Sequence, residues 1–507
     1  MIIARCQSFT FSGIDAVPVE VQVQLTSGLP SFLLVGLAEK AVTEARERVR
    51  AALASMGLSL PPRRVLINLA PADLVKEGSH LDLPIALSLL TAMNVIPSDQ
   101  MAGFAALGEL SLDGRMLPVA GILPAAIGAI AANQGLICPR SQSREAGWAG
   151  NIEILASDDL SGLVNHFRGI LPLPPPDPAE ILPAEEQNAY QVPDLADVRG
   201  MESARRALEI AAAGGHNLLM IGPPGSGKSM LAARMPGLLP NLSPAEALEV
   251  SMIHSVAGLL KEGRLLTRPP FREPHQGASQ AALAGGGQKA KPGEISLAHR
   301  GILFLDELPE FPRQALEALR QPMETGRTTI ARAAAHITYP ARFQLVAAMN
   351  PCRCGFLDDA YQCCIRAPRC AEVYQSRVSG PILDRIDLVV SVTPATPAEL
   401  AHEPPGESTV VVAARVAAAR ARQTDRYGDD GPRCNADAGS DLIGMNGEAR
   451  ALAEKAMTKL HLSPRGYTRL ARVSRTIADL AGELHITRAH VAEALMFRHR
   501  PAGRTAA

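Results

Sequence analysis

The sequence predicts an α/β domain built on a parallel sheet, preceded by an α+β domain and followed by a helical region. Two short apolar runs, Leu218–Ile221 and Ile302–Leu305, have the length and composition of buried strands. A third run, 343–349, ends in the polar residue Asn350. Because segments with helical periodicity separate and follow these runs, we expect strands and helices to alternate along a parallel sheet.

Length and composition shifts divide the chain. The 507 residues are enough for two to four domains. We expect a first domain over 1–168 and a Pro-rich linker over 169–193, because the repeated prolines favour an extended chain. An α/β core is expected over 194–395, and a helical lid with a C-terminal tail over 396–507.

Composition and charge are those of an ordinary globular protein. Apolar residues make up 47% and charged residues 20%, and the formal net charge is −1, so any basic surface must be local. Aromatic residues make up only 4%, which disfavours base stacking as the main binding device. The first residues lack the pattern of a signal peptide, and the uncharged run 116–139 is interrupted by prolines. We expect a cytoplasmic protein without a membrane span.

The first domain mixes strand and helix patterns. Residues 19–25 alternate between apolar and polar side chains, and 32–35 and 65–69 are also short strand candidates. Helical patterns cover 39–56 and 82–93. This mixture predicts an α+β or α/β arrangement for residues 1–168.

The segment that follows Ile221 fits the phosphate-binding pattern G-x-x-x-x-G-K-[ST]. Its glycines let successive backbone N–H groups turn toward phosphate oxygens. We expect Lys228 to bind the β- and γ-phosphates and the Ser229 hydroxyl to bind Mg²⁺. The expected loop consists of Gly222, Pro223, Pro224, Gly225, Ser226, Gly227, Lys228 and Ser229. The sequence therefore predicts a nucleoside triphosphate site with Mg²⁺.

Polar residues at the ends of the later strands complete this predicted site. Asp306 is expected to hold Mg²⁺, and Glu307 to orient or deprotonate the attacking water. Asn350 is placed to sense the γ-phosphate and position water. Arg385 is expected to reach the nucleotide of a neighbouring subunit and stabilise charge on the transferred phosphoryl group, and the alternative is a salt bridge to Asp384 or Asp387.

Two segments of the first domain, KEGSHLDL at 76–83 and GELSLDGRMLPVAG at 108–121, resemble the proteolytic domain of Lon proteases. That family uses a Ser–Lys dyad. Here Leu123 and Pro124 follow the second segment, no lysine lies nearby, and Ser79 is out of register by one residue. A serine without a neighbouring amine is a poor nucleophile. We therefore expect a Lon-protease-like fold without protease chemistry.

The order of phosphate loop, acidic strand end, Asn-tipped strand and Asp-Arg pair resembles AAA+ ATPases. Within that class, the segments FREPHQ at 271–276, PGEISLAH at 292–299 and NPC at 350–352 resemble the magnesium-chelatase-type branch. Together with the first domain, the whole chain resembles the ComM/YifB family of competence-related proteins. The resemblance implies a hexameric ATP-driven DNA motor that promotes branch migration while incoming DNA is recombined during natural transformation.

The resemblance also implies residue roles. Lys228 and Ser229 would be the Walker A pair, with Asp306 and Glu307 as the Walker B pair. Asn350 would be sensor 1 and Arg385 the arginine finger. Arg465 would be sensor 2, with Arg472 as a rival for that role and a surface helix start as the alternative for Arg465.

One basic segment is a candidate for DNA contact. Residues 327–338 have the pattern of two strands joined by an Ala-rich turn, and Arg327, Arg332 and His336 are placed to contact phosphates without reading sequence. The segment 252–268, which includes His254, Lys261, Arg264 and Arg268, is a second candidate. The alternative for both is an ordinary solvated basic surface.

Five cysteines lie between positions 352 and 370. Zinc takes four ligands in a tetrahedron, and the candidates are Cys352, Cys354, Cys370 and one of Cys363 or Cys364. Reduced structural thiols and a redox-sensitive loop are the alternatives.

Two other functions fit parts of the pattern. The motor subunit of a magnesium-chelatase-type complex would share the core motifs, but a Lon-like first domain would not be expected there. A nucleotide-gated scaffold without hydrolysis is disfavoured by the presence of Lys228, Asp306, Glu307, Asn350 and Arg385.

Overall fold

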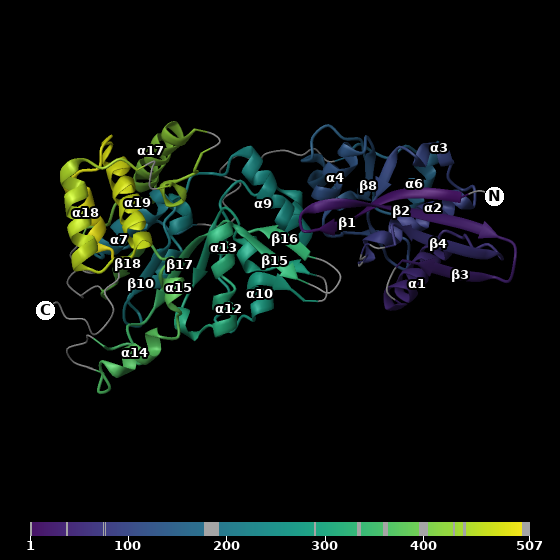
Figure 1. Cartoon of the computed structure of the whole chain (residues 1–507). Helices are drawn as coiled ribbons and strands as arrows, with labels where there is room; N and C mark the ends of the chain where they lie inside the picture. Colours follow the sequence, from purple (N-terminus) through teal and green to yellow (C-terminus); the bar gives the residue numbers. More distant parts are fainter. Residues whose placement is uncertain are drawn as a thin grey trace.

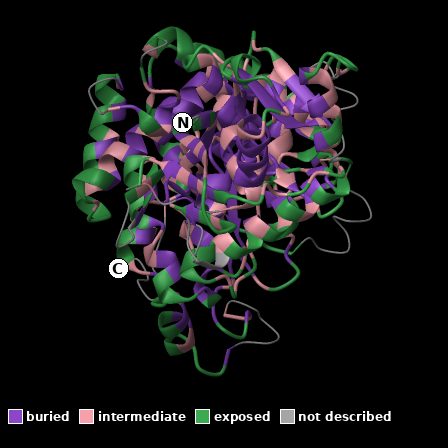
Figure 2. Ribbon diagram, turned by 90° about the vertical axis from the view of Figure 1, so that its right-hand side faces the viewer, coloured by how far each residue is buried: buried purple, intermediate pink, exposed green. Residues whose placement is uncertain are grey.

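The computed structural model shows an elongated molecule with the first domain at one end and the helical C-terminal region at the other (Figure 1). The structure describes residues 3–36, 39–72, 74, 76, 78–176, 192–287, 290–331, 336–357, 364–394, 404–428, 431–439 and 443–498. Most of the predicted linker, 177–191, lies outside the described residues. Buried residues gather in the interior, and exposed residues cover the periphery (Figure 2).

The first domain contains a mixed seven-stranded sheet, in the order β3-β4-β2-β1-β5-β8-β9, among the described residues. The β1–β2 and β2–β4 pairs are antiparallel, and the remaining neighbours are parallel. The strands are β1 (Ile3–Ser12), β2 (Asp15–Thr26), β3 (Ser31–Val35), β4 (Arg64–Ala70), β5 (Phe104–Ala106), β8 (Gly135–Pro139) and β9 (Ile154–Ser157), with a small hairpin of β6 (Glu109–Leu110) and β7 (Met116–Leu117).

Helices cover both faces of this sheet. Alternation along β1 directs Cys6 into a cluster with α2 and Phe9 into a second cluster with α4. The helices are α1 (Glu39–Ser55), η1 (Ser79–Leu81), α2 (Asp82–Ala92), α3 (Ser98–Met101), α4 (Ile122–Ala131), η2 (Arg140–Gln142), α5 (Ser143–Gly147) and α6 (Leu160–Phe167). The mixed strand and helix composition predicted for this domain is confirmed.

The second domain is built on a five-stranded parallel sheet in the order β11-β14-β17-β10-β18. Strands β14 and β17 are buried along their whole length, which explains their uninterrupted apolar sequence. The sheet strands are β10 (Leu218–Ile221), β11 (Phe271–Arg272), β14 (Ile302–Leu305), β17 (Gln344–Met349) and β18 (Leu388–Ser391). Two small hairpins are β12 (Gly285–Gly286) with β13 (Lys291–Pro292), and β15 (Arg327–Ala331) with β16 (His336–Pro340).

Short helices surround this sheet and complete the α/β core. They are η3 (Leu195–Asp197), α7 (Glu202–Gly214), α8 (Lys228–Ala232), η4 (Met235–Leu238), α9 (Pro244–Ala257), η5 (Lys261–Gly263), α10 (Gln280–Ala284), α11 (Glu294–Leu297), η6 (Leu308–Glu310), α12 (Arg313–Glu317), α13 (Arg320–Thr325), α14 (Arg369–Gln375) and α15 (Gly380–Leu383). Leu219 of β10 faces the apolar cluster that contains η6 and α12, whereas Leu218 faces the opposite cluster.

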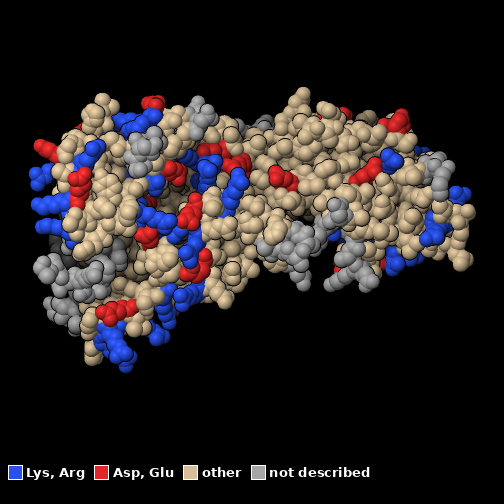
Figure 3. Space-filling view, in the orientation of Figure 1, with Lys and Arg blue, Asp and Glu red and all other residues tan. Residues whose placement is uncertain are grey.

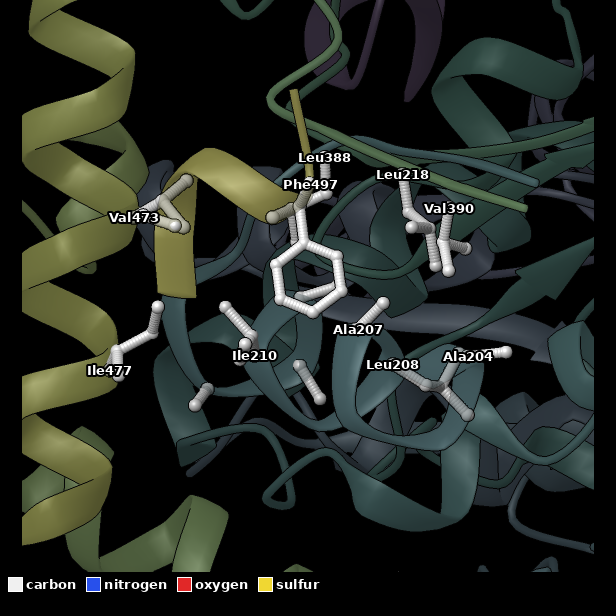
Figure 4. Close-up of a cluster of buried hydrophobic side chains, with 14 of the residues drawn as sticks. Ala204, Ala207, Leu208, Ile210, Leu218, Leu388, Val390, Val473, Ile477 and Phe497 are labelled. Carbon is white, nitrogen blue, oxygen red and sulfur yellow. The ribbon is translucent and has the colours of Figure 1, made fainter. Parts of the chain in front are cut away.

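The C-terminal region packs as a helical layer against α7. Its helices are α17 (Thr409–Tyr427), η7 (Asn435–Asp437), α18 (Gly447–Lys459), α19 (Pro464–Ala481) and α20 (Arg488–Met496). Val473 and Ile477 of α19 face α7, and Phe497 lies beside Leu388 and Val390 of β18 (Figure 4). The helices expected over 396–507 are therefore present, and Thr487, the N-cap residue of α20, forms a capping box with His490.

The two domains meet at α9 and the β15–β16 hairpin (Figure 1). The Gly121 amide donates to the Ser255 carbonyl at 3.0 Å, and the Ser255 hydroxyl donates to Glu145 at 2.5 Å. The Trp148 indole donates to the Gly263 carbonyl at 2.8 Å. These hydrogen bonds join the first domain to the core.

The described helices include none that is long and apolar enough to cross a membrane. The uncharged run 116–139 instead forms β7, α4 and β8, which lie within the first domain.

Candidate nucleotide site

The phosphate loop follows β10 and leads into α8. A Cβ on Gly222 would lie 2.1 Å from the Val392 carbonyl oxygen, so this close approach requires glycine. Gly225 and Gly227 have φ angles of 75° and 83°, in the left-handed region. The sequence pattern and the backbone therefore agree on a tight loop at the carboxyl end of the central strand.

Lys228 bridges this loop and the neighbouring strand end. Its ammonium group donates to the carbonyl oxygens of Gly222 and Pro223, each at 2.8 Å, and to the Asn350 side-chain oxygen at 3.3 Å. Burial lowers the pKa of Lys228, and the Asp306 and Glu307 carboxylates oppose that change. The ammonium group therefore joins the loop to the end of β17.

The predicted Mg²⁺ ligands lie together. The Ser229 hydroxyl donates to the Asp306 carboxylate at 2.6 Å, which joins α8 to the end of β14. Glu307 is exposed and has φ 52° and ψ 47°, and its amide donates to Asp306 at 2.9 Å. A left-handed non-glycine residue stores backbone strain, which is common at active sites.

Asn350 is anchored at the tip of β17. Besides its contact with Lys228, its backbone lies close enough to Tyr374 of α14 to affect the pKa of that hydroxyl. Burial, followed by the Glu310 and Glu307 carboxylates, raises the pKa of Tyr374 to about 12, so this hydroxyl stays protonated. The structure therefore brings Lys228, Asn350, Asp306 and Glu307 to one edge of the sheet, as parallel strands dictate.

Glu273 is a site residue that the sequence analysis missed. It follows β11, which pairs with β14, so it lies at the same sheet edge as Asp306. Partial burial, followed by the Asp306 carboxylate, raises the pKa of Glu273. Its position within the segment FREPHQ was the available signal. The preceding Arg272 pairs with Glu294 at 2.6 and 2.8 Å, which joins the FREPHQ and PGEISLAH segments.

Arg385 is held away from this cluster by other partners. Its guanidinium pairs with Glu324 of α13 at 2.6 Å and donates to the Pro381 carbonyl at 2.7 Å. The alternative prediction, a salt bridge from Arg385 to Asp384 or Asp387, names the wrong partner. Arg385 pairs with Glu324, and Asp384 accepts from Arg469 at 2.6 Å.

The two candidates for sensor 2 differ in environment. Arg465 is 70% exposed and lies 3.7 Å from Glu324, which places it beside Arg385. Arg472 donates to the Ala438 carbonyl at 2.8 Å within the helical layer. This geometry favours Arg465 as the arginine that is free to move, and its role stays a prediction.

The predicted hairpin exists, and its two faces differ. Arg327 and His336 are exposed, whereas Ile330 and Tyr339 are buried. The buried face packs with Ile14 of the first domain and Val256 of α9. Arg332 lies outside the described residues.

The second DNA candidate segment is partly wrong. His254 is buried and pairs with the Leu297 carbonyl at 3.0 Å, so it is unavailable to DNA.

Among the described residues, the nearest serine and lysine of the Lon-like segments each contact other groups. The Ser79 hydroxyl donates to Glu109, and the Lys76 ammonium donates to the Pro71 and Leu74 carbonyls. Asp82 is buried against Arg48. The absence of protease chemistry stays a prediction.

Four of the five clustered cysteines converge. The Sγ atoms of Cys352, Cys354, Cys364 and Cys370 all lie within 4.8 Å of one another. Cys363 lies outside the described residues. A backbone hydrogen bond from Phe356, followed by the neighbouring thiols, lowers the pKa of Cys354 to about 7.

The fold and this site define an AAA+-type P-loop protein with a C-terminal helical layer. Three family models match the chain: "Magnesium chelatase, subunit ChlI" over residues 194–400, "Subunit ChlI of Mg-chelatase" over 20–142, and "Magnesium chelatase, subunit ChlI C-terminal" over 406–498.

The chain is 42% identical to the protein YifB of Escherichia coli over 487 residues, which covers 96% of this chain and 95% of that protein. It is 41% identical to the competence protein ComM of Haemophilus influenzae over 499 residues, which covers 98% of both chains. The chain therefore belongs to the magnesium chelatase-like ComM/YifB family.

Similarity to a chelatase subunit is more limited. The magnesium-chelatase 38 kDa subunit of Rhodobacter capsulatus is 29% identical over 169 residues, which covers 30% of this chain and 48% of that subunit. However, the family model that matches the first domain is also named after ChlI. The presence of that domain is therefore a weaker argument against a chelatase role than the sequence analysis assumed.

Proposed function

We propose that this protein is an ATP-driven DNA motor that promotes branch migration when incoming DNA is recombined during natural transformation. The observation that carries the proposal is the convergence of Lys228, Ser229, Asp306 and Asn350 at one sheet edge, with Glu307 beside them. This is the set of groups that hydrolysis of a nucleoside triphosphate requires. The competence role is supported by similarity to ComM along nearly the whole chain.

ATP and Mg²⁺ are the cofactors that these groups fit. The loop amides and the Lys228 ammonium supply donors for phosphate oxygens, and the Ser229 and Asp306 oxygens are ligands of the kind that Mg²⁺ prefers. Glu307 is the base or water-orienting group, because it is exposed beside this pair.

A homo-oligomeric ring, expected to be a hexamer, would complete the site. Within one chain the Arg385 guanidinium is bound to Glu324 and Pro381. A neighbouring subunit would therefore present its own Arg385 to the nucleotide and leave Glu324 to pair with Arg465. Nucleotide turnover in one subunit would then act on the next, which is how a ring motor couples hydrolysis to movement.

The DNA contact is assigned to the exposed face of the β15–β16 hairpin. Arg327 and His336 lie on this face, and Thr329 and Thr338 pair between them with their hydroxyl oxygens 3.3 Å apart. These are groups that bind backbone phosphates and read no bases, so binding would be independent of sequence and sensitive to salt.

A second candidate function is the motor subunit of a magnesium-chelatase-type complex. The three family models, which are named after ChlI, favour it. The limited coverage of the chelatase subunit of Rhodobacter capsulatus argues for the DNA motor instead.

The decisive experiment measures ATP turnover with and without forked DNA, at two salt concentrations. The proposal predicts that DNA raises the turnover of the wild type and that high salt reduces this effect. An Arg327→Ala variant should keep the DNA-free rate and lose part of the stimulation, whereas Arg313→Ala, at another exposed site, should behave as the wild type. A rate of ATP turnover that does not change when DNA is added, at either salt concentration, would contradict the proposal.

A further inference from the structure

A small lobe built from residues 351–357 and 364–375 projects below the parallel sheet, with α14 at its lower end (Figure 1). Its apolar interior is small and consists of Cys352, Cys364 and Ala371, with Leu357 and Cys370 against them. Ile365 and Val373 are exposed instead of contributing to this interior. So few apolar contacts do not hold a loop-rich lobe together. Small units of this kind depend on a cross-link, either a disulfide or a structural metal ion.

The four thiols lie close enough together to form such a cross-link. The Cys352 and Cys354 sulfur atoms are 3.1 Å apart, and all four sulfur atoms lie within 4.8 Å of one another. Zinc bonded to four thiolates at about 2.3 Å gives sulfur–sulfur edges of about 3.8 Å, so the cluster needs only small shifts to close around the metal. A disulfide would require a sulfur–sulfur distance of about 2.05 Å and would leave two thiols unused.

We propose that Cys352, Cys354, Cys364 and Cys370 bind one structural Zn²⁺ ion. The side chains differ in accessibility, since Cys352 is buried and Cys354 is exposed, so the cluster is not simply part of an apolar core. Arg353, Arg366 and Arg369 are exposed around it, and their charges offset the net charge of about −2 on a four-thiolate zinc site. Figure 3 shows Lys and Arg atoms at the lower tip of the molecule, where α14 lies.

The zinc site would stabilise the nucleotide site through two contacts. Gly355 lies between the first two ligands and the rest of the lobe, and a Cβ there would lie 2.4 Å from Pro224 Cδ of the phosphate loop. The helix that carries Cys370 also contacts the end of β17, because Gln375 donates to the Pro351 carbonyl at 3.0 Å and Tyr374 lies beside Asn350. Metal binding would therefore fix Asn350 and Pro224 relative to each other. This effect on turnover rests on the proposed ATPase function, whereas zinc binding does not.

The test is metal analysis of the full-length protein purified without added chelator. The proposal predicts about one equivalent of zinc per chain and, after replacement with Co²⁺, the intense absorption of a four-thiolate cobalt site. Cys370→Ser and Cys364→Ser should each lose most of the metal. Cys363→Ser, which removes a neighbouring thiol, should keep it and serves as the matched control.

A second measurement separates the effect of zinc on the nucleotide site from an effect on overall folding. Cys370→Ser should hydrolyse ATP about tenfold or more slowly while it binds a fluorescent ATP analogue with nearly unchanged affinity. Less than about a tenth of an equivalent of zinc in the wild type, together with no cobalt spectrum, would overturn the site. Metal loss from Cys363→Ser but not from Cys364→Ser would overturn the ligand assignment. Zinc loss without any change in ATP turnover would overturn the proposed effect of zinc on the nucleotide site. If zinc is present but turnover is absent in the wild type, the proposed function fails and the metal site stands.

Discussion

At the scale of single residues, the backbone at Glu307 is the most informative feature of the site. This left-handed glutamate lies two residues after the buried strand β14, its side chain is exposed, and its amide donates to Asp306. Asp306 and Glu307 are adjacent in sequence but differ in their surroundings, because the first contacts Ser229 and the second is exposed. Such a strained turn is retained where it positions a reacting group.

The first prediction follows from this division of roles. Glu307→Gln should keep ATP affinity and slow hydrolysis by about 100-fold or more, because the amide fills the same space but does not accept a proton. Single-turnover hydrolysis and equilibrium binding of a fluorescent ATP analogue measure the two effects separately. As a control, Glu310→Gln, three residues further along, should retain most activity. A loss of about tenfold or less in the Glu307 variant would count against its role as base.

At the scale of elements, α9 joins the two domains and carries a buried histidine. The helix begins with a capping box formed by Ser243 and Glu246 and ends at Ala257, next to the interdomain hydrogen bonds of Ser255. The pKa of His254 is lowered to about 4, mainly by burial and also by nearby Arg272, whereas the Leu297 carbonyl and Glu294 oppose the change. The histidine is therefore neutral in the fold near pH 7.

The second prediction concerns acid stability. A histidine in an unfolded chain has a pKa of about 6.5, so the unfolded state takes up a proton before the folded state does. The contribution of His254 is fully present above pH 6.5 and is lost as the pH falls toward 4. Thermal unfolding between pH 7.5 and 4.5 should show a declining midpoint. His80, which is also buried with a pKa lowered to about 4, adds to the same trend in the first domain.

Substitution separates this effect from general acid unfolding. His254→Gln keeps a donor for the Leu297 carbonyl and should flatten the pH dependence of the midpoint. His485→Gln, at an exposed position, should leave the slope of the wild type unchanged. Equal slopes in all three proteins would show that His254 is not responsible.

At the scale of the whole molecule, the predicted catalytic residues form two groups with different contacts. Lys228, Asp306 and Asn350 meet at the sheet edge, whereas Arg385 and Arg465 share Glu324. An arginine that is already paired within its own chain is available to a neighbour only when that neighbour offers a stronger acceptor, and a triphosphate is such an acceptor. The separation therefore favours a shared active site.

The third prediction tests the shared site by mixing variants. Lys228→Ala and Arg385→Ala should each be inactive alone. In an equal mixture, about a quarter of the interfaces would pair an intact phosphate loop with an intact arginine, so part of the activity should return. ATP turnover is measured across mixing ratios, after dissociation and reassembly of the subunits. Absence of any recovery would indicate that Arg385 acts within its own chain.

Local sequence patterns were sufficient for the phosphate loop, the strands that lead to Asp306 and Asn350, and the helical character of the C-terminal region. Each depends on nearby residues: an apolar run that must be buried, a glycine that must turn, or a side chain that caps the helix next to it. Tertiary structure alone decided that Arg385 pairs with Glu324 and that His254 is buried, and it placed Glu273 beside Asp306 and Cys364 among the other thiols. These are contacts between residues far apart in the chain, and they depend on how the strands are ordered in the sheet, which no short segment specifies.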